Sequence, residues 1–262
     1  MATIDITTNK DSYVTQMSPT QNCGTETSFQ VQSCYLLEYE VAANYRAFVG
    51  FDLSSIPAGS TINSATLKIY RTGSGNGTYA QGRTYWFERV TGAWTETGVT
   101  WNNQPAVTTT NRVSKVSPAN NDGEWWNLTV TGMVQDAFAG GVVSFRIKDN
   151  SEDFTVDIAW QEFWAKEYGS LMPTLTVDYT PVCTTYDNVY VDSVSGNDAN
   201  CGNTVGSPVK TFVRAYALLN SGGAIHILNS GADFSAETPT LNKSYSMDLN
   251  GASGYFYGSK AS

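Results

Sequence analysis

The chain has 262 residues, of which 15% are charged and 13% aromatic, and its formal net charge at pH 7 is −9. An acidic chain with few basic residues offers no continuous positive surface to a nucleic-acid backbone, which argues against a DNA- or RNA-binding role. A hydrophobic content of 41% is enough to fill a core, and no apolar run approaches the roughly 18 residues of a membrane span. Few charges with many aromatic, threonine and glycine residues favour β-rich structure.

The N-terminal residues Met1 to Asp5 lack the basic and apolar segments of a signal peptide. The expectation is therefore a mature protein, or one that reaches an external surface without the secretory pathway, as virion proteins do.

The first 180 residues alternate apolar and polar side chains with the two-residue period of β-strands. In residues 64–70, for example, Ala65, Leu67 and Ile69 share one face. One short helix, residues 131–139, interrupts this pattern. The pattern predicts an all-β jelly roll or sandwich with strands at residues 43–53, 64–70, 84–90, 126–130, 142–147 and 174–179.

The pattern changes near Pro181, which predicts a domain boundary. The expected division is a sandwich at 1–180, a linker at 181–187 and a second β-domain at 188–262. In the second domain we expect a helix at 213–219 and strands at 189–192, 224–228, 241–249 and 255–257.

Four cysteines form two local pairs along the chain, Cys23 with Cys34 and Cys183 with Cys201. This spacing predicts two short-range disulfides, although four cysteines allow three connectivities. Paired disulfides would indicate an extracellular setting. The alternative is four buried thiols.

Several motifs of residues 1–180 occur in the order of a known family. Residues 46–57 read R-x-x-x-x-F-D-L-S-x-I-P, residues 94–105 read W-x-E-x-x-V-T-W-x-x-x-P, and residues 173–179 read P-x-L-x-V-x-Y. The strand motif S-A-x-L stands at 64–67, and a helix-turn motif follows residue 128 with Phe138 in place of the usual tryptophan. In these motifs the chain resembles the DNRLRE domain family.

That resemblance implies a jelly-roll β-sandwich similar to carbohydrate-binding modules. Such domains occur on secreted, cell-surface and phage structural proteins, and some bind acidic polysaccharide. Within the signature, Trp94 and Trp101 are expected to serve packing.

Residues 188–262 resemble the opening of right-handed parallel β-helix proteins, a group that includes tailspikes, adhesins and polysaccharide lyases. The similarity lies in Tyr190-Val191-Asp192, in residues 202–212, and in the strand Gly222-Gly223-Ala224-Ile225-His226. Only about two turns fit before Ser262, whereas a solenoid needs about three to bury its core. We therefore expect a fragment, or an open end covered by another copy or subunit.

Sugar recognition uses aromatic faces that stack on pyranose rings, with polar side chains on the ring hydroxyls. Adjacent aromatic residues on a strand face opposite ways, so one residue of each neighbouring pair is expected in the core. The alternative is that all these residues serve the core or an interface. The candidate glycan-binding residues are Trp125, Trp126, Trp86, Tyr85, Trp164, Arg89 and Lys148.

Catalytic residues are not indicated. His226, the one histidine, alternates within an apolar strand, which indicates a structural role. The carboxylates Glu88, Glu96, Asp153 and Glu162 show no spacing that singles out a glycosidase pair. The chain is therefore predicted not to be an enzyme.

No cofactor is expected apart from a structural calcium ion, for which acidic loops supply oxygen ligands. Solvated loop acids are the alternative. The weak metal candidates are Asp122, Glu124, Asp149 and Asp153.

Three hypotheses of function follow. The first is a non-catalytic, adhesive module that binds a polysaccharide or cell-surface glycan. The second is a phage tail fibre, spike or head decoration that acts mainly in assembly. The third is the N-terminal part of a polysaccharide-degrading β-helix enzyme. All three place the chain outside the cell or on a virion surface, as a homo-oligomer or within a larger assembly.

Overall fold

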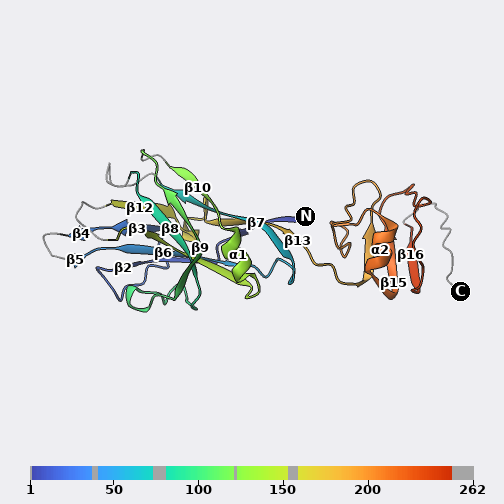
Figure 1. The fold of residues 1–262 in the computed structure, drawn as a ribbon, viewed down its shortest axis with the longest axis horizontal. Helices are drawn as coiled ribbons and strands as arrows, with labels where there is room; N and C mark the ends of the chain where they lie inside the picture. Colours follow the sequence, from blue (N-terminus) through green and yellow to red (C-terminus); the bar gives the residue numbers. More distant parts are fainter. Residues whose placement is uncertain (1, 37–40, 73–80, 121–122, 153–158, 250–262) are drawn as a thin grey trace. The chain divides into compact units, whose positions relative to one another are not determined.

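The computed structural model describes residues 2–36, 41–72, 81–120, 123–152 and 159–249 (Figure 1). By its internal contacts the chain divides into two compact units. The larger comprises Thr3–Ile56 and Ile62–Asp178, and most of the smaller comes from Tyr179 onward. Among the described residues, no helix is long and apolar enough to cross a membrane.

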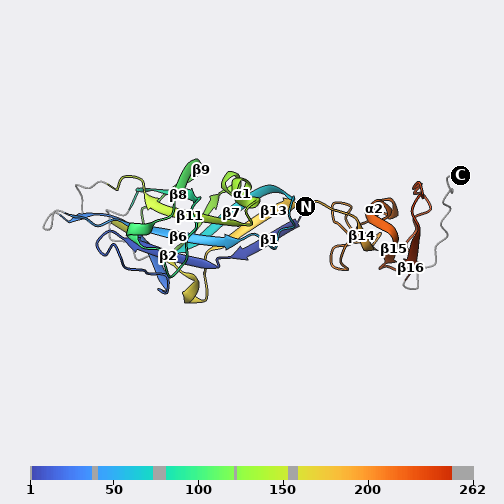
Figure 2. The same cartoon turned by 90° about the horizontal axis from the view of Figure 1, so that it is seen from below.

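The larger unit is a β-sandwich, so the prediction of an all-β sandwich is confirmed (Figures 1 and 2). The first layer follows the order β1 (Ala2–Thr7), β13 (Thr174–Thr180), β7 (Thr61–Arg71), β12 (Ala159–Trp164) and β3 (Ser28–Ser33), with β10 (Glu124–Thr129) paired to β7. The second layer contains β2 (Lys10–Thr15), β6 (Tyr45–Asp52), β11 (Val142–Asp149), β8 (Thr84–Val90) and β9 (Val107–Val116). A single pair, Gln32 with Tyr45, joins β3 to β6 and links the layers into one path.

Several short elements accompany these layers in the larger unit. A two-stranded hairpin, β4 (Tyr35–Leu36) and β5 (Val41–Ala42), stands apart from the sandwich sheet. The helix α1 (Thr131–Phe138) ends before Gly141, whose φ of 71° suits glycine. The short turn η3 (Lys166–Tyr168) follows β12.

Alternation along each strand places the large aromatic side chains between the layers. In β8, Tyr85 is fully buried while Trp86 faces outward. In β10, Trp126 is fully buried while Trp125 faces outward. The Trp126 ring lies 5.7 Å from Tyr85 of the second layer and 5.1 Å from Phe163 of the first. These contacts hold the two layers together.

A second, smaller core lies on the outer face of the second layer. The loop between β8 and β9 brings Trp94, Val99 and, at the start of η2 (Trp101–Asn103), Trp101 over a buried patch. Phe48 is at the centre of that patch, with its ring 5.7 Å from Trp94. The motif tryptophans therefore pack against the sheet.

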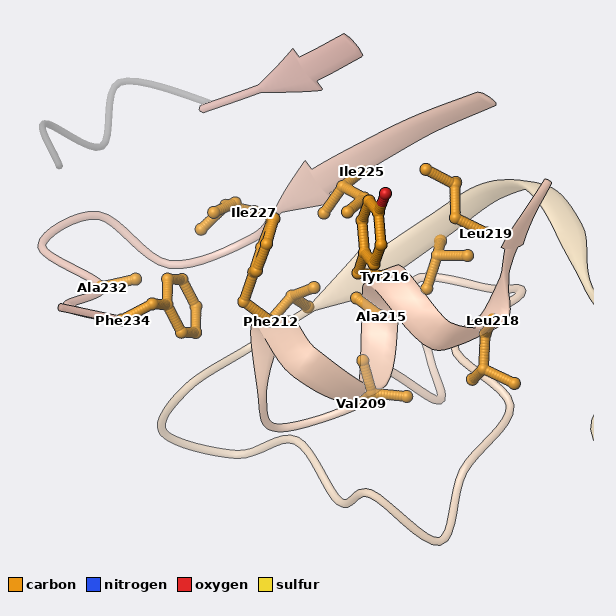
Figure 3. Close-up of a cluster of buried hydrophobic side chains, with 12 residues drawn as sticks. Val209, Phe212, Ala215, Tyr216, Leu218, Leu219, Ile225, Ile227, Ala232 and Phe234 are labelled. Carbon is orange, nitrogen blue, oxygen red and sulfur yellow. The ribbon is translucent and has the colours of Figure 1, made fainter. Parts of the chain in front are cut away.

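The smaller unit contains a parallel sheet of β14 (Tyr186–Val191), β15 (Leu219–Ile227) and β16 (Tyr245–Asp248). The helix α2 (Phe212–Leu218) packs against this sheet (Figure 3). Thr211 caps its N-terminus, where the Thr211 side chain accepts a hydrogen bond from the Arg214 backbone N–H. Val189, Ile225 and Met247 occupy equivalent positions on the three strands. The unit has its own buried hydrophobic cluster, centred on Phe212.

The cysteines differ between the two units. Cys183 and Cys201 form a disulfide with a Cα–Cα distance of 4.9 Å. The disulfide predicted between Cys23 and Cys34 is wrong, because both residues are buried thiols. The Cys23 thiol lies beside the Tyr13 hydroxyl and its pKa is raised, mainly by burial. Cys34 follows the end of β3, where its carbonyl accepts a hydrogen bond from Ala43.

Candidate functional site

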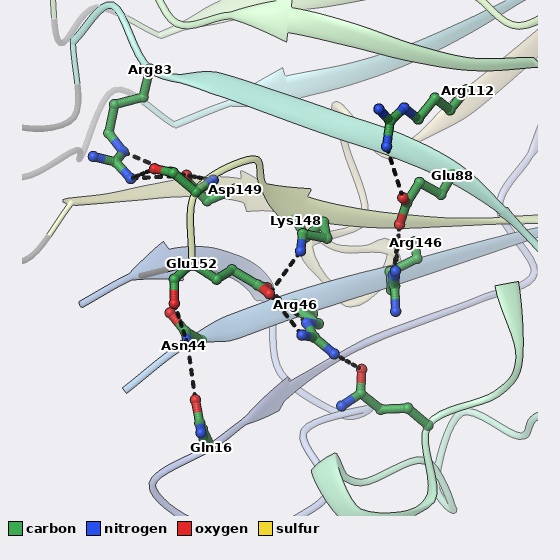
Figure 4. Close-up of polar contacts among 12 residues, drawn as sticks. Gln16, Asn44, Arg46, Arg83, Glu88, Arg112, Arg146, Lys148, Asp149 and Glu152 are labelled. Carbon is green, nitrogen blue, oxygen red and sulfur yellow. Dashed lines mark hydrogen bonds and ion pairs between the residues drawn. The ribbon is translucent and has the colours of Figure 1, made fainter. Parts of the chain in front are cut away.

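Charged side chains converge on the outer face of the second layer (Figure 4). The small tryptophan-lined core is adjacent, since Arg46 contacts Trp101. Register explains the convergence, since Lys148 of β11 stands opposite Trp86 of β8, and Arg146 stands opposite Glu88. We call this surface the basic face, and it comprises Arg46, Trp86, Glu88, Arg112, Arg146, Lys148 and Glu152.

Glu88 is the buried anchor of the basic face, with 3% of its side chain exposed. Its Oε2 accepts a hydrogen bond of 3.0 Å from Arg146 Nε, and its Oε1 lies 3.8 Å from Arg112 Nη1. A buried carboxylate is tolerated only when it is paired. Glu88 therefore fixes one arginine from β11 and one from β9.

Glu152 is the second anchor. Arg46 donates to both of its carboxylate oxygens at 2.7 Å, and Lys148 Nζ donates to Oε2 at 2.7 Å. Burial opposes ionisation of Glu152, but the hydrogen bonds from Arg46 and Lys148 outweigh it, so the pKa of this carboxyl lies below its usual value. The guanidinium of Arg46 also lies 4.6 Å from the Trp101 ring centroid.

Trp86 is covered by cations. The Arg112 guanidinium lies 3.7 Å from the centroid of the indole, and Lys148 Nζ lies 5.7 Å from it. The Arg112 side chain is 37% exposed, the most of any charged group on this face. The guanidinium covers the indole, so the cation is the group that is exposed to solvent. The indole in turn stabilises the cation through a cation–π contact.

The basic face has four cationic side chains and two carboxylates, a local net charge of +2 in a chain whose net charge is −9. The carboxylates are the least exposed members, at 3% and 12%. Within the described part of the chain, the Arg112 guanidinium makes no hydrogen bond, so its N–H donors are available to a ligand. Chemically, this arrangement can bind anions.

Residues 2–179 match the model of carbohydrate-binding module family 96. The chain belongs to carbohydrate-binding module family 96. Modules of this kind are typically non-catalytic, and the family together with the disulfide fits an extracellular or secreted protein. No curated protein matches the chain.

Two of the predicted glycan-binding residues, Trp86 and Lys148, lie together on the basic face of the module. Two others are corrected by the structure: Trp126 and Tyr85 have no exposed surface. Both point inward because each alternates with an outward-facing neighbour, and their rings contact one another in the core.

Trp125 and Trp164 belong to the outer face of the opposite layer of the module. Trp125 is 39% exposed, on β10. The Trp164 ring is stacked on Tyr168, with the centroids 3.8 Å apart and the planes 3° apart, so one face of this indole is already occupied. Neither residue joins Trp86.

Arg89 lies in a separate pocket of about 480 Å³, together with Lys10, Trp94 and Asp136. Its Nη2 is 3.8 Å from a carboxylate oxygen of Asp136. Arg89 therefore does not contribute to the basic face.

Two of the four metal candidates lie among the described residues, and both interact with other side chains. Asp149 is fully buried and pairs with Arg83 at 2.6 Å. Glu124 accepts a hydrogen bond of 2.8 Å from the Trp126 indole. Asp122 and Asp153 lie outside the described residues, and the described residues contain no group of three or more potential metal ligands.

Sequence reasoning did not select Arg46, Arg112 or Arg146 as binding residues. Arg146 and Lys148 do alternate on β11, which is the one signal that could have indicated a basic strand face. Arg112 belongs to β9, a strand that the alternation pattern did not predict, so its approach to Trp86 depends on tertiary pairing.

Proposed function

We propose that this module binds acidic polysaccharide through the basic face. The family supplies the ligand class, carbohydrate. The observation that carries the proposal is the position of Arg112, stacked on Trp86 and exposed to solvent. A face that binds neutral sugar would instead expose its indole for stacking, whereas Arg112 covers Trp86 on the basic face.

The chemistry of the cations favours a carboxylate or sulfate group on the sugar. A guanidinium offers a planar pair of N–H donors that matches a carboxylate, and this pairing is stronger than a neutral hydrogen bond. Glu88 and Glu152 hold the cations in place, so a ligand does not have to order them. The extracellular setting, in which such polymers occur, agrees with the disulfide.

Isothermal titration calorimetry with sodium polygalacturonate as the probe tests the proposal. We expect Arg112→Gln to weaken polygalacturonate binding about tenfold, the loss of roughly one charged hydrogen bond. Lys210→Gln, which removes one positive charge from the smaller unit, serves as the control and should leave the affinity unchanged. Equal affinity of Arg112→Gln and wild type, or no binding of polygalacturonate, would refute the proposal.

For the smaller unit, we propose a parallel β-helix-like segment that acts in assembly of a fibre or spike. The support is the parallel pairing of its three strands, in which Val189, Ile225 and Met247 are aligned. Multi-angle light scattering of the full chain tests it: a trimer is the expected result, and a monomer across the concentration range would contradict it.

A further inference from the structure

The outer face of the first layer, opposite the basic face, carries a shallow groove of about 400 Å³. Four strands of the larger unit contribute to it. We call it the Trp125 groove, and its lining residues are Asp5, Lys68, Trp125, Asn127 and Thr174.

Strand register sets the order of side chains in this groove. Trp125 stands opposite Tyr70, and Asn127 stands opposite Lys68, in the antiparallel pair of β10 and β7. Residues two apart on a strand share a face and are separated by about 7 Å. An exposed indole, an amide and an ammonium group are therefore neighbours on one surface.

The Trp125 indole is held in place but not covered. The Tyr70 ring meets it in a T-shaped contact, with the centroids 5.3 Å apart and the planes 81° apart. Trp125 remains 39% exposed, and no cation of the described residues lies over it. This differs from Trp86, which Arg112 covers. An immobilised, uncovered indole is the surface on which the apolar face of a sugar ring stacks.

The polar groups around Trp125 suit neutral hydroxyls. Among the described residues, the side chains of Lys68 and Asn127 make no hydrogen bond or ion pair, so both have donors to offer. Asp5 accepts one hydrogen bond, from the Thr176 hydroxyl at 2.5 Å, and keeps capacity to accept more. A hydroxyl both donates and accepts, and the opposite charges of Lys68 and Asp5 leave the groove without a net charge that would favour an anionic ligand.

We propose that the Trp125 groove is a second carbohydrate site, specific for a chain of neutral pyranose sugars. One ring stacks on Trp125, and its hydroxyls bond to Lys68, Asn127 and Asp5. The module thus has two glycan sites of different charge preference on its two outer faces. This proposal is independent of the ligand that we propose for the basic face.

The test uses the full chain and three soluble probes, cellohexaose, mannohexaose and xylohexaose, in calorimetric titrations. The expected result is binding of at least one hexaose, weakened more than tenfold by Trp125→Ala and several-fold by Asn127→Ala. Tyr168→Ala is the matched control, because Tyr168 is similarly exposed, at 43%, but lies outside the groove. Absence of binding by all three probes, or equal binding by wild type and both groove variants, would overturn the proposal.

A competition experiment separates this site from the basic face. With polygalacturonate present in excess, the hexaose affinity is expected to be unchanged. Displacement of the hexaose would place both ligands on one surface and contradict a second site. Failure of polygalacturonate to bind, with hexaose binding intact, would reject only the acidic ligand.

Discussion

The buried carboxyl of Asp11 makes the folding stability of the sandwich depend on pH. It is 2% exposed on β2, and its Oδ2 accepts a hydrogen bond of 2.9 Å from the Lys166 backbone N–H. Its pKa is raised from 3.8 to about 7, mainly by burial and also by the nearby carboxylates of Glu167 and Glu96, while the hydrogen bond from Lys166 opposes this rise. The folded state therefore binds a proton that the unfolded state releases between about pH 4 and 7.

Because the folded-state pKa of Asp11 is raised, this group costs stability as the pH increases through that window. In the variant Asp11→Asn, the amide oxygen can still accept the hydrogen bond from the Lys166 N–H, but the side chain can no longer ionise. We expect equal free energies of unfolding for variant and wild type near pH 4. Above that pH, the variant should gain up to about 1.4 kcal/mol per pH unit relative to wild type, until about pH 7. Urea denaturation at pH 5 and pH 8 measures the difference, and parallel pH dependences would contradict the assignment.

Between elements, Glu88 ties β8 to β11 and β9 through Arg146 and Arg112. Replacing it by glutamine leaves the largely buried Arg146 without a counter-charge. We expect Glu88→Gln to lower the free energy of unfolding by about 2–3 kcal/mol, somewhat below the cost of breaking a fully buried pair because Arg146 keeps some solvent contact.

The matched control for Glu88→Gln is Asp136→Asn. Asp136 is 35% exposed and lies 3.8 Å from Arg89. An exposed pair of this kind contributes less than about 1 kcal/mol. Chemical denaturation of both variants gives the comparison, and equal losses would show that burial of Glu88 does not matter.

Strand prediction succeeded where one face is consistently apolar. The pattern located β8 at residues 84–90 and the cores of β7, β10, β11 and β13, because their inward positions are hydrophobic. It missed β12, where buried Gln161 contacts Arg71 and interrupts the apolar alternation. It also missed β9, which is exposed on most positions and exists through its pairing with β8.

Prediction of the candidate site was limited in the same way, because part of it depends on tertiary pairing. Alternation correctly separates outward Trp86 and Trp125 from inward Tyr85 and Trp126, although it cannot say which residue of each pair is outward. What surrounds an outward indole depends on neighbouring strands. Arg112 arrives from β9 and covers Trp86, whereas nothing comparable covers Trp125 among the described residues.

At the scale of the whole molecule, an overall acidic chain can still carry a surface suited to anions, because four of its positive charges lie together on one face. The chain has a net charge of −9, yet its basic face has a net charge of +2. An acidic polymer, the proposed ligand, would therefore be attracted by the basic face and repelled by the rest of the surface. This combination favours engagement of one face over adsorption of the polymer across the whole surface.

The Cys183–Cys201 disulfide has a mechanical consequence for a protein attached to a polysaccharide. Tension that enters the smaller unit along the backbone at residue 183 passes through the S–S bond to residue 201. The residues between them, which include β14, carry none of that load, so pulling cannot extend them. Under oxidising conditions the strand that begins the parallel sheet is protected from unravelling, and reduction of this one bond would remove the protection.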